Sequence, residues 1–298
     1  MQTALEERSL AVRLSLNITN FSPSQDPAEL GAWLGRIARA ADESGLDTLW
    51  VSDHLLQADP NSSPGAEMLE AYTTLGFLAS QTERIRLGTM VTAVTYRPPA
   101  LLVKAVTTLD VLSGGRAWLG IGAGYHQGEA TAMGLPLPEV GERFERLEET
   151  LRIALAMWAG DDTAFEGIRY HLACPVNSPN SIRRPHPPIV IGGMGESKTL
   201  PLVARYADAC NLFDIPDGGK TVTHKLAVLA GHCEQVGRSY DDIEKTLSTR
   251  LQPGESPDAF ARRCSEIAAL GIEHIVVIVA GPWTDDAVAT LAATARRC

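Results

Sequence analysis

Short β-rich runs alternate with longer amphipathic stretches along nearly the whole chain. The β-rich runs predict strands at 12–19, 48–52, 85–91, 116–122, 189–193, 209–213, 243–250 and 274–279. Apolar residues at three- and four-residue spacing predict helices at 29–44, 100–112, 142–158, 198–206, 221–236, 257–270 and 285–296. This alternation is typical of βαβ units around a parallel sheet.

The number of repeats predicts the closed form of that sheet. Eight strand–helix units in roughly 250 residues match a (β/α)₈ TIM barrel, whereas open doubly wound sheets usually have fewer strands. No Gly/Ser-rich linker and no solenoid repeat divides the sequence. We therefore expect an α/β fold with a single barrel domain over residues 11–298.

Two segments are longer than ordinary connections, at 55–70 and 159–188. We expect both to be insertions at the C-terminal mouth of the barrel, because long loops on a compact scaffold are usually lids or binding loops. The second segment is rich in proline and is predicted to contain a hairpin at 163–172. It is also predicted to act as a lid over the substrate side of the mouth.

Composition narrows the class of partner. The chain has 298 residues, 45% of them hydrophobic, and a formal net charge of −10, which disfavours nucleic acid and anionic membrane surfaces. Its five cysteines form no C-x-x-C pair, which predicts reduced thiols in the cytoplasm and no metal site. No apolar run is long enough for a membrane span, and the first residues lack the apolar run of a signal peptide.

The pair Asp53-His54 follows a predicted strand and is the first candidate for chemistry. In a barrel the end of a strand faces the mouth, where a His beside a carboxylate is suited to general acid–base work. The alternative is a His that only caps the next segment.

A second candidate is the glycine-rich turn after the strand at 189–193. Gly192, Gly193, Met194, Gly195 and Glu196 lead into a predicted helix, so that backbone amides and the helix N-terminus can cradle a phosphate. The spacing is neither G-x-G-x-x-G nor a P-loop. Tight packing of the strand onto the helix is the alternative.

A third candidate is the segment 118–126, in which glycines alternate along a strand and lead to Ala123, Gly124 and Tyr125. Small residues there leave room for a flat ring across the barrel mouth. The alternative is a barrel interior too narrow for side chains. The strand that includes Met90 and Val91 is expected to form another wall.

Together these segments resemble the luciferase-like superfamily, and especially its branch that uses the deazaflavin coenzyme F420. The resemblance extends over roughly 13–279 and rests on five ordered matches, at 43–54, 82–89, 112–124, 141–149 and 191–208.

The resemblance implies roles for particular residues. Asp53-His54 matches the family's Asp-His pair, whose His lies by the reactive edge of the ring and moves a proton. Gly193, Met194 and Gly195 match the loop that holds the cofactor phosphate. Met90-Val91 falls where F420-binding relatives have a non-proline cis peptide behind the ring.

The chain departs from the family pattern at two positions. Tyr125 stands where the sugar-phosphate dehydrogenases of the family have a catalytic Glu, so their substrate is not carried over. Met194 stands where Gly is commoner. Because the flavin monooxygenases generally lack the Asp-His pair, the resemblance favours F420 over FMN.

These observations lead to one functional hypothesis. We expect hydride transfer between F420 and a small or medium organic substrate, with His54 moving the proton and Asp53 setting its tautomer. The alternatives are an FMN-dependent monooxygenase and a cofactor-binding protein without turnover. Members of the superfamily usually form homodimers, which the resemblance implies here.

Overall fold

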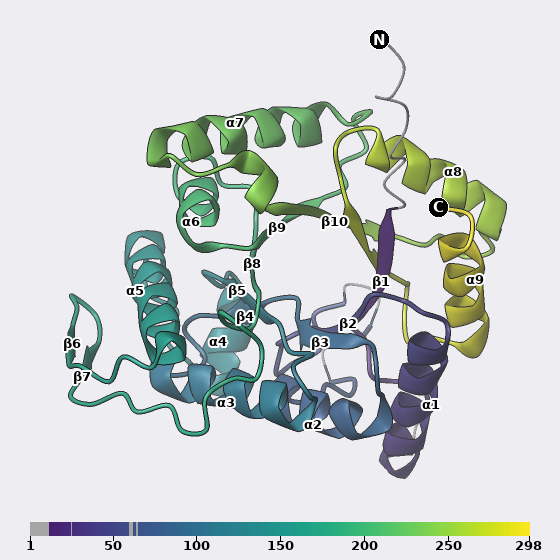
Figure 1. Cartoon of the computed structure of the whole chain (residues 1–298). Coiled ribbons are helices and arrows are strands. Elements are labelled where there is room, and N and C mark those ends of the chain that lie inside the picture. Colours follow the sequence, from purple (N-terminus) through teal and green to yellow (C-terminus); the bar gives the residue numbers. More distant parts are fainter. Residues whose placement is uncertain (1–11, 25, 60–61, 64) are drawn as a thin grey trace, which may run out of the picture.

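The computed structural model describes residues 12–298 apart from 25, 60, 61 and 64. Residue 11, the predicted start of the domain, lies outside the described residues, as do three positions of the segment 55–70. Helices form a ring around a parallel sheet (Figure 1). Of the helices in the described part of the chain, none combines the length and apolarity needed to cross a bilayer.

The sheet closes into the predicted eight-position barrel. Its strand order is β3-β2-β1-β11-β10-β9-β8-β5-β4. The ends of this sheet meet where Leu87 of β3 pairs with Ala117 just before β5. β3 and β4 are two halves of one barrel strand, so nine strands fill eight positions. The strands are β1 (Arg13–Ile18), β2 (Thr48–Val51), β3 (Arg86–Thr89), β4 (Thr92–Ala93), β5 (Leu119–Gly122), β8 (Ile189–Gly192), β9 (Ala209–Phe213), β10 (Glu244–Arg250) and β11 (His274–Ile278).

The helices confirm the predicted alternation and add two elements. All seven predicted helices are present as α1 (Leu30–Glu43), α3 (Pro99–Leu112), α5 (Val140–Ala159), α6 (Thr199–Tyr206), α7 (Lys220–Val236), α8 (Pro257–Ala268) and α9 (Asp285–Ala295). Two helices were not predicted, α2 (Ala71–Gln81) and α4 (Gln127–Met133). In α2 the buried face combines Leu75 and Leu78 with Ala and Thr, and Phe77 lies on the exposed face, so the two faces differ little in polarity.

Large side chains fill the lower part of the barrel. Trp50, Trp118, Val190, Ala209 and Val276 form one buried cluster inside it. Gly88 makes room for the two indoles, because a Cβ there would lie 2.7 Å from Trp50 and 2.8 Å from Trp118. The barrel interior is therefore filled at the level of Gly88. In the segment 118–126, Gly120 packs against the Thr89 carbonyl oxygen, whereas Gly122 and Gly124 line the open cavity described below.

The two long segments behave differently. The segment 55–70 does reach the mouth, where Ala58 and Asp59 line the cavity described below. Within 159–188 the predicted hairpin is confirmed by the antiparallel pair β6 (Phe165–Glu166) and β7 (His171–Leu172), which projects from the ring beside α5 (Figure 1).

The predicted lid is wrong, because no residue of 159–188 lines the mouth cavity. Residues 173–188, called the strap below, instead run along the outer side of α3 and α5. The Lys104 ammonium donates to the Ser178 carbonyl at 2.5 Å, and the Asn180 amide donates to the Trp158 carbonyl at 2.9 Å. The buried Asp110 carboxylate accepts from the Ile182 amide at 2.7 Å. Proline indicated an ordered path but carried no information about which surface the path follows.

Candidate functional site

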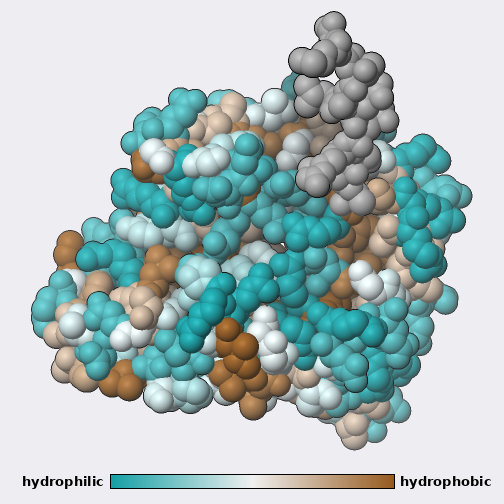
Figure 2. Space-filling view, in the orientation of Figure 1, coloured by the Kyte–Doolittle hydropathy of each residue, from teal (hydrophilic) through white to brown (hydrophobic). Residues whose placement is uncertain are grey.

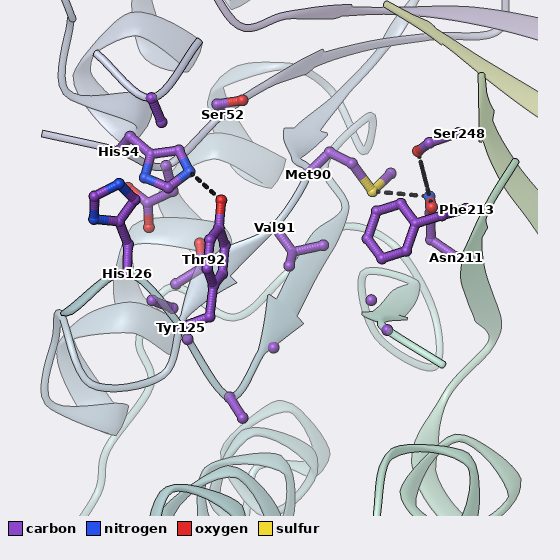
Figure 3. Close-up of a pocket in the computed structure, with 18 of the residues that line it drawn as sticks. Ser52, His54, Met90, Val91, Thr92, Tyr125, His126, Asn211, Phe213 and Ser248 are labelled. Carbon is purple, nitrogen blue, oxygen red and sulfur yellow. Dashed lines mark hydrogen bonds between the residues drawn. The ribbon is translucent and has the colours of Figure 1, made fainter. Parts of the chain in front are cut away.

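A cavity of about 530 Å³ opens at the carboxyl ends of the barrel strands, within the usual range for ligand pockets. This is the end of the barrel where active sites of the fold are built. Its strand-end side chains include Asn17, Ser52, His54, Met90, Asn211, Phe213, Ser248 and Arg250. Figure 3 shows His54, Tyr125 and His126 on one side, Asn211, Ser248 and Phe213 on the other, and Val91 between them.

His54 is held by a carboxylate, but not by the one predicted. Its Nδ1 lies 2.8 Å from Oε2 of Glu129, the third residue of α4. Asp53 does not contact the imidazole and instead makes a bidentate pair with Arg97, at 2.6 and 3.0 Å. The expectation that Asp53 sets the tautomer is therefore wrong, because adjacent residues at a strand end point in opposite directions.

Glu129 is buried and accepts several hydrogen bonds. Its carboxylate receives the backbone amides of Leu55 at 2.5 Å and Leu56 at 2.9 Å, and the hydroxyl of Tyr96. Burial opposes ionisation, but the hydrogen bonds from His54, Tyr96 and the two amides outweigh it and lower the pKa of Glu129 to about 2. Burial and the bond to Glu129 raise the pKa of Tyr96. Glu129 is therefore an ionised acceptor at neutral pH.

Asp53 has a different task. Arg97 links it to Glu70, at 2.5 Å, and stacks over the Tyr72 ring with its guanidinium carbon 4.7 Å from the ring centroid. Despite its own burial, Arg97 has a raised pKa because of Asp53 and Glu70. This pair anchors the loop between β4 and α3 beneath the mouth.

Aromatic rings surround His54 on the cavity side. The Tyr125 hydroxyl lies 3.5 Å from His54 Nε2, and the His126 ring centroid lies 5.8 Å from that of His54. His126 also caps α4, since its Nδ1 accepts from the Glu129 amide at 3.0 Å. Tyr125 is 72% exposed, so its ring stands at the open edge of the cavity.

Val91 packs between two glycines at the cavity wall. The expected cis peptide between Met90 and Val91 is confirmed. A Cβ at either Gly122 or Gly192 would lie 3.1 Å from the Val91 side chain, so the two glycines let Val91 pack closely against the ends of β5 and β8. Ala123 and Gly124 continue the lining toward Tyr125.

The opposite wall is polar. The Asn211 and Ser248 side chains hydrogen-bond to each other at 2.9 Å, and Asn211 also contacts the Met90 sulfur. Within the described residues the buried Asn17 Oδ1, on β1, has no hydrogen-bond partner. A ligand in the cavity would meet these groups.

The glycine-rich turn reaches the site only in part. Gly192 and Gly193 line the cavity together with Thr199 of α6, whereas Met194, Gly195 and Glu196 do not. The Gly193 amide is already used by the Asn211 carbonyl at 3.1 Å. Glu196 is directed away to α7, where it pairs with Lys225 at 2.5 Å. Among described residues the amides of Met194 and Gly195 have no acceptor. Because these two residues do not line the cavity, a phosphate bound to their amides would lie at its edge.

Several site residues were missed from the sequence. Asn17, Asn211 and Ser248 interrupt apolar strands with polar side chains that point inward, a signal that strand alternation makes readable. Glu129 lies on a helix after the strand, where no local pattern marks it. Arg143 lines the cavity and lies within the family match at 141–149, but was not predicted as a site residue. Within the described ranges, no three His, Cys, Asp or Glu side chains gather closely enough to hold a metal ion.

Comparisons with known proteins agree with this architecture. Residues 15–291 match the model of the luciferase-like monooxygenase family. A relative from Amycolatopsis mediterranei (strain U-32), an F420-dependent glucose-6-phosphate dehydrogenase, is 34% identical over 218 residues, which are 71% of this chain and 62% of that protein. The chain thus spans less than two thirds of that relative's length.

Two solved structures share the fold. An F420-dependent secondary alcohol dehydrogenase, in complex with an F420-acetone adduct, has a TM-score of 0.81 at 15% identity, covering 95% of this chain and 99% of its own. The monooxygenase RslO1 from Streptomyces bottropensis has a TM-score of 0.78 at 17% identity, covering 96% and 98%. With the family model matching most of its length, the chain belongs to the luciferase-like monooxygenase family.

Proposed function

We propose that this protein is an oxidoreductase that transfers a hydride between coenzyme F420 and a small or medium organic substrate, with His54 as proton donor or acceptor. The observation that carries the proposal is His54 itself. A buried carboxylate holds its Nδ1, and its Nε2 faces the cavity at the carboxyl ends of the barrel strands. Sequence relatives that are F420-dependent dehydrogenases support the cofactor.

The residues present fit a deazaflavin. The part of the cavity wall formed by Gly122, Val91 and Gly192 carries no long side chain and would accept the face of a flat ring, and Oδ1 of Asn17 offers a polar contact. The amides of Met194 and Gly195, with Thr199 beside them, would hold the phosphate at the edge of the cavity. When bound, the deazaflavin supplies the hydride acceptor or donor.

The substrate would lie between that ring and His54. Tyr125 and His126 lie side by side at the open edge, and each carries a polar group on an aromatic ring. Position 125 is a Tyr and not the catalytic Glu of the family's sugar-phosphate dehydrogenases. We therefore do not extend the sugar-phosphate substrate of the relatives to this chain.

Titration with F420 and with FMN, followed by fluorescence, tests the cofactor. We expect saturable binding of F420 with a dissociation constant at least tenfold lower than that for FMN. Tighter binding of FMN, with turnover supported by reduced FMN and oxygen, would support the monooxygenase alternative instead. Tight F420 binding without turnover on a panel of alcohols and carbonyls would support a binding protein.

We also propose a homodimer. Large apolar side chains are exposed on α2 and α3, namely Phe77, Leu101 and Leu112, with Leu112 71% exposed. Figure 2 shows apolar residues at the lower edge of the view, where Figure 1 places these two helices. Sedimentation analysis should give twice the 32.0 kDa chain mass, and Leu101→Glu should shift the protein to monomer. A monomeric wild type would refute the dimer.

A further inference from the structure

The imidazole of His54 has two distinct environments. Nδ1 faces the buried Glu129 carboxylate at 2.8 Å. Nε2 faces the cavity, where the Tyr125 hydroxyl lies 3.5 Å away as its one hydrogen-bond partner among the described residues. Only one of these nitrogens carries the proton in a neutral imidazole. The protein therefore has to select a tautomer, and the selection decides what His54 offers to a substrate.

We propose that Glu129 is a positioning residue that fixes neutral His54 as the Nδ1–H tautomer, so that Nε2 presents a proton acceptor to the cavity. Glu129 is 1% exposed. Its carboxylate accepts hydrogen bonds from two backbone amides and the Tyr96 hydroxyl, and its remaining contact is His54 Nδ1. An ionised carboxylate only accepts hydrogen bonds. Nδ1 must then carry the hydrogen.

The surrounding contacts hold this arrangement from both sides. Oε1 is fixed by the amides of Leu55 and Leu56, which cannot act as acceptors. Oε2 is shared between the Tyr96 hydroxyl and His54. Because the two amides belong to the residues just after His54, the carboxylate and the imidazole are aligned by the same stretch of backbone.

The tautomer has a consequence for the substrate, which rests on the function proposed above. An unprotonated Nε2 accepts the proton of a substrate hydroxyl while the hydride of the adjacent C–H goes to the cofactor, which leaves a carbonyl. In the reverse direction the imidazolium returns the proton from Nε2 to the carbonyl oxygen as the hydride arrives. The site is therefore built for the alcohol–carbonyl pair.

The substitution Glu129→Gln should invert the tautomer. The carboxamide oxygen remains with the two backbone amides, since these are fixed donors, and the NH₂ group then faces His54 Nδ1. Facing a donor, Nδ1 becomes the acceptor and the hydrogen moves to Nε2. The isosteric variant thus keeps the packing and reverses what His54 offers to the cavity.

The tautomer can be measured directly in the protein without substrate or cofactor. Long-range ¹H–¹⁵N spectra of histidine-labelled protein, at a pH where the ring is neutral, separate the protonated nitrogen from the bare one. Loss of one of the seven histidine signals in His54→Ala assigns the resonance. We expect Nδ1–H in the wild type, Nε2–H in Glu129→Gln, and Nδ1–H retained in Asp53→Asn.

The spectrum of the wild type alone can overturn the proposal, if it shows the Nε2–H tautomer. The test therefore remains decisive even where the Glu129→Gln variant folds poorly. Inversion in Asp53→Asn but not in Glu129→Gln would assign the positioning role to Asp53 instead. F420 titration of the same samples is independent of the spectra, so failure to bind F420 would refute the proposed function and leave the tautomer result standing.

Discussion

At the scale of single residues, the site depends on two carboxylates with separate partners. Asp53 and Glu129 approach the same short stretch of chain, but Asp53 pairs with Arg97 and Glu129 with His54. The sequence motif Asp53-His54 suggested a direct contact between neighbours. The carboxylate that orients the imidazole lies 75 residues further along the chain, which no local pattern reveals.

His54 is the residue whose loss should affect turnover most. We expect His54→Ala to keep F420 affinity within about threefold, because the glycine walls and the turn before α6 lie on other strands. Turnover should fall by about 10²–10⁴, the usual contribution of a general acid–base group. Single-turnover kinetics and fluorescence titration measure the two effects. Near-normal turnover at an unchanged melting temperature would rule out this role.

Asp53 should matter for stability more than for proton transfer. Its side chain is fully buried in the pair with Arg97, and its removal leaves the largely buried guanidinium with the more exposed Glu70 as its remaining ion partner among the described residues. Asp53→Ala should lower the free energy of unfolding by about 3 kcal/mol in urea denaturation. Asp285→Ala is the matched control, because its pair with Arg36 is exposed and should be worth no more than about 1 kcal/mol. Equal losses in the two variants would contradict this assignment.

Glu129 predicts a specific dependence of stability on pH. Its folded-state pKa of about 2 lies below that of a Glu in the unfolded chain, about 4.3. Ionised Glu129 therefore stabilises the fold above pH ~4.3, and this contribution is lost as the pH falls toward 2. The unfolding free energies of wild type and Glu129→Gln should differ less at pH 3 than at pH 6. A difference that is constant with pH would exclude an ionised Glu129.

At the scale of elements, the sequence predicted the strands well and the helices unevenly. Strand β9 was predicted to the residue, because apolar runs between polar turns are local signals. Helix α2 was missed because its buried side mixes leucines with Ala and Thr while Phe77 is exposed, which blurs the contrast between its faces. Helix α4 was missed because it is short and directly follows the glycine-rich end of β5. Missing α4 meant missing Glu129, so the error in the site followed from an error in an element.

The glycines of the barrel wall give a prediction at this scale. A Cβ at Gly120 would lie 1.8 Å from the Thr89 carbonyl oxygen, so β5 and β3 could not keep their separation. Gly120→Ala should therefore cost at least about 3 kcal/mol or prevent folding. Gly76→Ala is the control, since nothing lies within 4 Å of that exposed helical position and a gain of about 0.5–1 kcal/mol is expected. Thermal and urea unfolding compare them, and a well-folded Gly120→Ala would disprove the close approach.

At the scale of the whole molecule, the barrel separates a filled lower half from an open mouth. The two tryptophans fill the interior below Met90, and the cavity above them opens at the carboxyl ends of the strands. The number of strand–helix units in the sequence predicted this barrel. That number does not change when the bounds of single elements are predicted wrongly. It did not predict where the strap lies, since that depends on buried anchors such as Asp110, which are distant in sequence.

The different positions of the two long segments predict which parts of the backbone exchange hydrogen more slowly when the cofactor binds. Hydrogen exchange measured with and without saturating F420 should slow in peptides covering 52–59, 90–96 and 192–199, which border the cavity. The strap should exchange at the same rate in both states, because its bonds to α3 and α5 lie on the outer wall. The hairpin of β6 and β7, whose Ile168 and Tyr170 amides donate to Glu149 away from the cavity, serves as a second reference that F420 should leave unchanged. Protection of the strap equal to that at the mouth would mean that it closes over the ligand after all, and that the outer-wall bonds exchange for contacts at the cavity.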